Sequence, residues 1–376
     1  MRKKIGRNEP CWCGSSLKYK RCHLDRDKME PLKPWEADKE FRRAFSAEEC
    51  LAPEPMKSGC SNVIVKAHTV PRSGSLQQIA RKGHVYSYIP TPSLLNLTKY
   101  GGKLQPRLVG INLASTFNGF CSIHDNRIFS KIENQAFVSS QEQCFLLAYR
   151  ALTRELYAKK SAASLSNVRH QLDRGKSLEQ QTVIQTLNHG VDIGTSAGLG
   201  DSEYHKEIHD KVLLSGDFGT VHAYVIELES PPPIMCSGGM FPEYDFQGNQ
   251  LQDLLDLKIK PHLITFTSFY GGNCGIIVFS WLSSSHPTCE RFINSLRELP
   301  PNRVTDALIR FFFEFCENLH IAPLWWESFE ARKRDTLERR FATAVSLFSP
   351  RNPACIAEDG VEFDDWPFIV SKKIGF

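Results

Sequence analysis

Two segments decide the fold that we expect for the middle of this chain: Cys60-Ser-Asn-Val-Ile-Val-Lys-Ala-His68-Thr-Val-Pro-Arg72 and Phe120-Cys121-Ser-Ile-His124-Asp125-Asn126. Each segment holds one cysteine and one histidine, with seven residues between them in the first and two in the second. Four nitrogen and sulfur donors of this kind match the tetrahedral coordination that zinc prefers. The pattern therefore predicts a zinc site made of Cys60, His68, Cys121 and His124.

The residues around these donors predict a strand, a long connection and a helix. The apolar run Val63–Val65 is typical of a short strand, with Cys60 before it and His68 just beyond its end. Ser122 and Asp125 stand in the S-x-x-D relation of a capping box, which favours a helix start there. That helix would carry an apolar stripe, namely Ile128, Phe129 and Ile132. We expect residues 60–135 to form a ββα-metal or treble-clef-like unit.

Part of this stretch resembles the HNH nucleases. Ala67-His68-Thr-Val-Pro is similar to their Asp-His-Ile-Val-Pro segment, and Cys121–Asp125 lies where their closing helix begins. The resemblance implies a metal-dependent nuclease, in which His68 would act as the general base. Asp125, with His124, would hold a divalent ion such as Mg²⁺ or Mn²⁺ against the scissile phosphate, and Asn118 would stand for the middle Asn of the motif.

One departure keeps a second interpretation open. HNH enzymes carry a metal-binding acid before the first histidine, and this chain has Ala67 there. His68 cannot be both a zinc ligand and a free base, because its lone pair would be committed to the metal. The alternative is a zinc site that only stabilises the fold, in a binding or scaffold protein that docks to a protein or ribosome partner.

The N-terminus carries the most specific pattern in the sequence. Its cysteines and histidine have the spacing C-x-C-x8-C-H within Gly6-Arg-Asn-Glu-Pro-Cys11-Trp-Cys13-Gly-Ser-Ser-Leu-Lys-Tyr-Lys-Arg-Cys22-His23. This segment closely resembles the SEC-C motif, best known from the C-terminal tail of the SecA translocation ATPase. The resemblance implies a zinc ion held by Cys11, Cys13, Cys22 and His23 and a role in docking to a macromolecule. A segment this short cannot bury enough apolar surface to fold alone, whereas a bound zinc ion can supply that free energy.

Charge and cysteine usage limit the partners and the compartment. The net charge is +4, yet residues 1–30 hold nine Lys/Arg against four Asp/Glu, so the rest of the chain is close to neutral. This local positive charge predicts a polyanionic partner such as nucleic acid at the N-terminus. Twelve cysteines without a secretory signal or a long apolar run predict a cytoplasmic protein that does not cross a membrane. Seven cysteines lie singly. Cys355 has no assigned role, and six are expected to be buried free thiols: Cys50, Cys144, Cys236, Cys274, Cys289 and Cys316.

A chain of 376 residues is too long for one ordinary core, and its composition predicts an α+β multidomain protein. We expect a zinc module at 1–30, a linker at 31–59, the metal unit at 60–135, a helical segment at 136–215 and an α+β domain at 216–376. Expected helices cover 141–160, 178–187, 291–296, 304–315 and 332–347. Expected strands cover 84–89, 221–228, 263–269, 275–282 and 368–370. The glycines of 190–200 should end the second helix, Gly238-Gly239 should form a turn, and His205 and His209 should lie on a solvated helix face.

Overall fold

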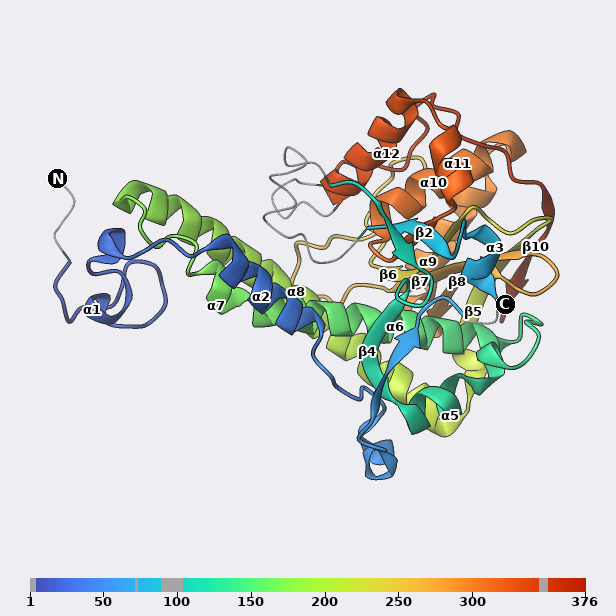
Figure 1. Ribbon diagram of the computed structural model, residues 1–376. Helices are drawn as coiled ribbons and strands as arrows, with labels where there is room; N and C mark the ends of the chain where they lie inside the picture. Colours follow the sequence, from blue (N-terminus) through green and yellow to red (C-terminus); the bar gives the residue numbers. More distant parts are fainter. Residues whose placement is uncertain (1–4, 72–73, 89–103, 345–350) are drawn as a thin grey trace. The chain divides into compact units, whose positions relative to one another are not determined.

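The computed structural model describes residues 5–71, 74–88, 104–344 and 351–376 (Figure 1). The chain forms a mixed α+β protein with two compact units. Of the described residues, unit one contains 5–47 and 158–200, and unit two contains 48–71, 74–88, 104–157, 201–344 and 351–376. The units combine segments from different predicted domains. The predicted domain boundaries therefore stay predictions. Within the predicted linker the structure places a helix, α2 (Pro34–Phe45).

Unit one is built from short helical pieces and from parts of two long helices. Its elements are α1 (Tyr19–Cys22), a 3₁₀ turn (Arg26–Lys28), α2, α7 (Ser166–Arg169) and the adjoining parts of α6 (Gln141–Ser164) and α8 (Leu178–Ser215). The side chains buried here are mostly polar, including His23, Arg26, Asp173 and Gln185. Both large apolar clusters of the described residues lie in unit two. Unit one therefore depends on polar contacts and on its cysteine–histidine cluster.

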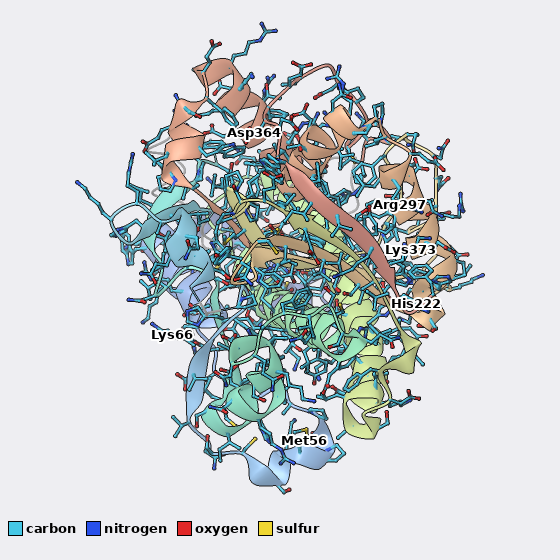
Figure 2. All side chains as sticks on the ribbon, turned by 90° about the vertical axis from the view of Figure 1, so that its right-hand side faces the viewer. Met56, Lys66, His222, Arg297, Asp364 and Lys373 are labelled. Atoms are coloured by element: carbon cyan, nitrogen blue, oxygen red, sulfur yellow. The ribbon has the colours of Figure 1, made fainter. Side chains whose placement is uncertain are left out.

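Unit two contains an antiparallel sheet with the strand order β10-β5-β8-β7-β6-β9-β2-β3, eight strands among the described residues. The strands are β2 (His84–Ser87), β3 (Arg107–Gly110), β5 (Val221–Leu228), β6 (Ile234–Met240), β7 (Ile264–Tyr270), β8 (Gly275–Leu282), β9 (Leu319–Ile321) and β10 (Phe368–Ile374). The edge strand β10 lies beside β5, with Lys373 opposite Tyr224, and Figure 2 shows Lys373 near His222 at this edge.

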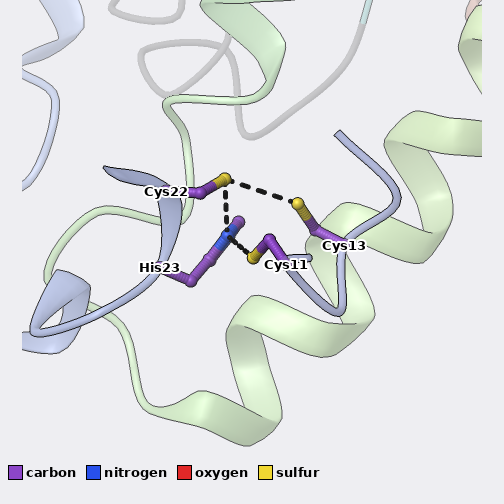
Figure 3. Close-up of side chains that lie close together, drawn as sticks. All are labelled: Cys11, Cys13, Cys22 and His23. Carbon is purple, nitrogen blue, oxygen red and sulfur yellow. Dashed lines mark hydrogen bonds between the residues drawn. The ribbon is translucent and has the colours of Figure 1, made fainter. Parts of the chain in front are cut away.

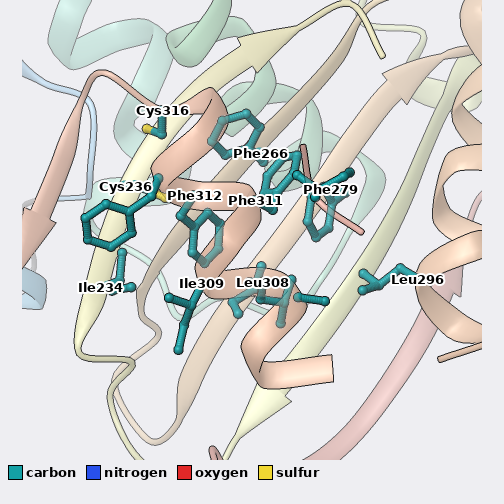
Figure 4. Close-up of a cluster of buried hydrophobic side chains, with 14 of the residues drawn as sticks. Ile234, Cys236, Phe266, Phe279, Leu296, Leu308, Ile309, Phe311, Phe312 and Cys316 are labelled. Carbon is teal, nitrogen blue, oxygen red and sulfur yellow. The ribbon is translucent and has the colours of Figure 1, made fainter. Parts of the chain in front are cut away.

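Apolar clusters cover both faces of the sheet. Successive side chains of a strand point to opposite faces, so one strand contributes residues to both clusters. In β5, Tyr224 and Ile226 join an apolar cluster with α9 (His286–Arg297), α10 (Pro301–Phe315) and α12 (Ala331–Ala344). Figure 4 shows the phenylalanines of this cluster against the strands. Ala223 and Val225 of the same strand join the cluster on the other face, which includes residues of α6. All eight residues of the central strand β8 are consequently buried.

A separate two-stranded sheet positions His68 and Cys121, two of the predicted zinc ligands. Strand β1 (Ile64–His68) pairs antiparallel with β4 (Thr116–Cys121), and helix α5 (Ser122–Glu133) follows directly. The stripe Ile128, Phe129 and Ile132 is buried, as the pattern predicted. The predicted capping box is absent, because Cys121 is the N-cap and Ser122 Oγ lies 2.9 Å from Ser61 Oγ instead.

Three expectations about local structure are wrong. Helix α8 continues through Gly190, Gly194, Gly198 and Gly200, each of which costs only about 1 kcal/mol relative to Ala. Gly238 and Gly239 lie inside β6, where they pair with Phe266 and Thr265 of β7. A Cβ at Gly238 would lie 2.9 Å from the Phe266 ring, which explains the glycine without a turn.

The third concerns His205 and His209, which are buried rather than solvated. Nε2 of His205 lies 2.7 Å from the Pro261 carbonyl, and Nδ1 of His209 lies 2.7 Å from the His205 carbonyl. The ring of His209 also stacks on Phe145. The two remaining α-helices are short, α3 (Ser75–Ile79) and α11 (Pro323–Ser328), and Trp326 of α11 is buried in the core. None of the helices within the described residues has the length and apolarity needed to cross a bilayer.

We predict that unit two loses stability as the solution becomes mildly acidic. Burial lowers the pKa of both His209 and His320 from 6.5 to about 3. Between these pH values the unfolded chain binds a proton at each histidine and the folded chain does not, so stability falls as the pH drops below 6.5. Each histidine should cost about 2 kcal/mol at pH 5.

The variant His320→Asn tests this in urea unfolding at pH 7 and pH 5. Asn can retain the contact that His320 Nδ1 makes with Ser87 Oγ at 2.7 Å, and it cannot be protonated. The variant should lose about 2 kcal/mol less than the parent between the two pH values. His84→Asn, at an exposed histidine, is the matched control and should follow the parent. Equal acid sensitivity of His320→Asn and the parent would contradict the prediction.

Candidate metal centres

The first centre gathers four donors at the N-terminus. Cys11 and Cys13 lie on a turn closed by the Gly14 N–H, which donates to the Cys11 carbonyl at 3.3 Å. Gly14 has φ +79°, a conformation that glycine adopts at little cost. Cys22 ends α1, and His23 follows it. The ligand atoms of these residues all lie within 4.8 Å of one another (Figure 3).

His23 has a different environment at each ring nitrogen. Nδ1 lies 3.2 Å from Cys11 Sγ and 3.1 Å from Cys22 Sγ, so it faces the thiols. Nε2 lies 2.8 Å from the Asp173 carboxylate, on the opposite side of the ring. Burial raises the pKa of the Cys11 thiol to about 12. Because zinc binds thiolates, a metal ion would displace this proton, and binding should release acid.

The second centre consists of Cys50, Cys60, Cys121 and His124, whose ligand atoms also lie within 4.8 Å of one another. His124 Nδ1 lies 3.3 Å from Cys50 Sγ, 3.4 Å from Cys60 Sγ and 3.3 Å from Cys121 Sγ. Three thiols and one imidazole are the donor set of a closed structural zinc site. The donors at both centres therefore fit zinc.

Residues 7–25 match the SEC-C motif. The match contains all four donors of the first centre and extends to Asp25, slightly beyond the segment that we recognised. No curated protein and no solved structure matches the chain. None of the comparisons relates residues 60–133 to an HNH nuclease or a treble-clef nuclease. The SEC-C motif thus accounts for the first centre, and the second rests on geometry alone.

Local structure brings the donors of the second centre together. The Leu51 N–H donates to the Gly119 carbonyl at 2.9 Å, which fixes Cys50 beside β4. A 3₁₀ turn (Glu54–Gly59) then reverses the chain, and Cys60 is its C-cap. Figure 2 shows Met56 of this turn at one end of unit two. Cys121 and His124 lie at the start of α5.

The thiols of the second centre differ in acidity. Burial raises the pKa of Cys121, but hydrogen bonds from the backbone N–H groups of His124 and Ser61 outweigh it and lower the pKa to about 6. Burial raises the pKa of Cys60 to about 11, and the neighbouring Cys50 thiol also acts to raise it. These hydrogen bonds therefore favour the thiolate at Cys121, the form in which cysteine binds zinc.

The structure corrects the sequence-based ligand set at one position, since Cys50 takes the place assigned to His68. In the β1–β4 pairing, Ile64 lies opposite Cys121, whereas His68 lies opposite Thr116 at the other end of the strands. Four strand residues span roughly 13 Å, which is too far for a ligand. Cys50 was expected to be a buried free thiol. Its position ten residues before Cys60 was the feature of the sequence that could have suggested it as a fourth donor. The other five cysteines that were expected to be buried thiols are free, and four of them are buried: Cys144, Cys236, Cys289 and Cys316.

The predicted catalytic residues do not form a metal-binding group. Asn118 lies in β4, where its carbonyl accepts a hydrogen bond from the Glu49 N–H at 3.2 Å. Asp125 lies in the first turn of α5, and burial raises its pKa. Within the part of the chain that the structure describes, no group of three or more potential metal-binding side chains includes His68 or Asp125. The arrangement implied by the HNH resemblance is therefore not assembled.

We predict that purified protein contains two zinc ions per chain and that Cys50→Ser removes one of them. The thiolate of Cys50 is one of four donors, and serine is a poor zinc ligand. His68→Ala should keep both ions, because His68 lies at the far end of β1. The measurement is the zinc-to-protein ratio of each variant by elemental analysis. A His68→Ala protein with one zinc, beside a Cys50→Ser protein with two, would restore the original ligand set.

Proposed function

We propose that this chain is a zinc-stabilised binding protein that recognises nucleic acid through its SEC-C motif. The observation that carries the proposal is the completeness of the two donor sets. Each contains four protein donors, Cys₃His, as structural zinc sites do, whereas catalytic zinc sites keep one position open for water or substrate. Zinc at the first centre would supply folding free energy to a segment with little apolar core of its own.

The charge of the SEC-C motif supports nucleic acid as the partner. Four basic side chains are exposed on it: Arg7, Lys18, Lys20 and Arg21. Two of its acidic side chains already have local partners. Glu9 accepts a hydrogen bond from the Gly6 N–H at 2.9 Å, and Asp25 pairs with Lys28 at 2.7 Å. A compact module with this balance would attract phosphates and release their counterions.

A metal-dependent nuclease is the less favoured proposal. A closed Cys₃His centre has no coordination position for an activated water molecule. His68 also lies at the end of β1 that faces Thr116, away from Cys121 and the second centre. The alternative within the binding class is a non-catalytic scaffold that docks to a protein or ribosome partner.

The test compares two charge-reversed variants with equal changes in net charge. The first carries Lys18→Glu, Lys20→Glu and Arg21→Glu on the motif. The second carries Lys258→Glu, Arg332→Glu and Arg339→Glu, exposed residues of unit two. Fluorescence anisotropy with labelled single-stranded RNA and duplex DNA gives Kd over a series of salt concentrations. Zinc content is measured on both variants, because Arg21 adjoins Cys22.

We expect the motif variant to bind about tenfold more weakly or worse, and to show a shallower salt dependence. Removing one phosphate interaction should reduce the slope of log K against log salt by about 0.7 to 0.9. The control variant should bind within about twofold of the parent. Equal weakening in both variants would mean that only net charge matters, and no binding by the parent would favour a protein partner. Cleavage of either probe with Mg²⁺ or Mn²⁺ would favour the nuclease.

A further inference from the structure

Asp173 lies behind the N-terminal metal centre, 150 residues from its histidine in sequence. Its Oδ2 is 2.8 Å from His23 Nε2, while His23 Nδ1 faces Cys11 and Cys22. Asp173 follows α7 and belongs to unit one, as the SEC-C motif does. Both side chains are buried. A carboxylate, an imidazole and a metal-binding group therefore lie in series.

Asp173 is surrounded by donors and has no exposed surface. Arg26 Nε donates to its Oδ1 at 2.5 Å, and Gln185 Nε2 donates to its Oδ2 at 2.7 Å. A buried carboxylate without partners costs several kcal/mol, so its position depends on these hydrogen bonds. Two of its three partners, His23 and Arg26, lie in the N-terminal segment. The turn between α7 and α8 thus holds a buried negative charge, and its charged partner among the described residues, Arg26, lies in the N-terminal segment.

Two hydrogen bonds to backbone carbonyl groups join the same two segments. The Gly175 N–H donates to the Arg26 carbonyl at 3.0 Å, and the Arg26 guanidinium donates to the His170 carbonyl. Gly175 has φ +72°, and a Cβ there would lie 2.8 Å from the Met29 carbonyl oxygen. The close approach of the two segments therefore requires glycine at this position.

We propose that Asp173 is a positioning residue for the N-terminal zinc centre, and that zinc binding is coupled to docking of the SEC-C motif on the α7–α8 segment. The inference rests on zinc binding by Cys11, Cys13, Cys22 and His23, and it goes beyond the proposed recognition of nucleic acid. For Nδ1 to bind the metal, the ring proton must lie on Nε2, and the Asp173 carboxylate accepts it. The coupling is reciprocal, because each event stabilises the conformation that the other requires.

Unit one contains a matched control for this carboxylate. Asp192 accepts from His170 Nε2 at 2.8 Å and from Arg169 at 2.7 Å, so it also binds one histidine and one arginine. The Nδ1 atom of His170 faces Gln185 Oε1 rather than a cysteine cluster. Asp192→Asn therefore weakens comparable hydrogen bonds without touching a metal ligand.

The first experiment measures the zinc affinity of the full chain by competition with a chromogenic chelator. Asp173→Asn should weaken the N-terminal site by about 10- to 100-fold, the usual effect of losing an outer-shell carboxylate. Asp192→Asn should stay within about threefold of the parent. Equal affinities for the two Asn variants would overturn the role of Asp173. A parent chain without zinc at Cys11–His23 would instead contradict the metal centre itself.

The second experiment tests the reverse direction of the coupling by hydrogen exchange. The Gly175 amide reports docking, because its only acceptor among the described residues is the Arg26 carbonyl. Cys13→Ser, which removes a metal ligand without contacting Asp173, should accelerate exchange at Gly175. The Arg169 amide, bonded to the Leu165 carbonyl within the helical segment, should be unaffected.

The variant His23→Cys separates the metal from the hydrogen bond. It offers zinc four thiolates, so the ion should be retained. It has no Nε2 to donate to Asp173, so exchange at Gly175 should rise. Unchanged protection of Gly175 in both Cys13→Ser and His23→Cys would overturn the coupling.

Discussion

The requirement that four metal donors meet within a few ångströms constrains the chain from Cys50 to His124. Cys50 precedes the 3₁₀ turn, and Cys60 lies between that turn and β1. Cys121 and His124 lie where β4 ends and α5 begins. The β1–β4 register places Cys121 beside the beginning of β1, and the Leu51–Gly119 hydrogen bond brings in Cys50. Backbone N–H groups of His124, in the first turn of α5, and of Ser61 lower the pKa of Cys121. The small sheet, the turn and α5 thus meet at one Cys₃His group.

The two units are stabilised by different kinds of interaction. Unit two buries apolar side chains on both faces of its large sheet, with Phe266 and Phe311 among the largest on one face. Unit one contributes no residue to either apolar cluster of the described chain, and its buried groups are mostly charged or polar. The Asp173 carboxylate links those groups to the SEC-C motif. In unit one, metal binding can therefore supply folding free energy that apolar burial does not provide.

The sequence predicted the features that depend on neighbouring residues. The bounds of β5 and β8, the apolar stripe of α5 and the donors of the SEC-C motif required only local periodicity and spacing. Features that depend on long-range contacts were missed. Cys50 joins the second donor group because a backbone hydrogen bond connects residues 51 and 119, and Asp173 meets His23 across 150 residues. Local spacing likewise favoured His68, although strand pairing carries it to the opposite end of β1.

Zinc K-edge X-ray absorption on the metal-loaded chain tests the central claim, that both centres are closed Cys₃His sites, most directly. The account predicts an average shell of three sulfurs at about 2.3 Å and one nitrogen at about 2.0–2.1 Å. A site with His68 in place of Cys50 would lower the average sulfur number. An open site would add an oxygen from water. An average clearly below three sulfurs, or an additional oxygen neighbour, would contradict the account.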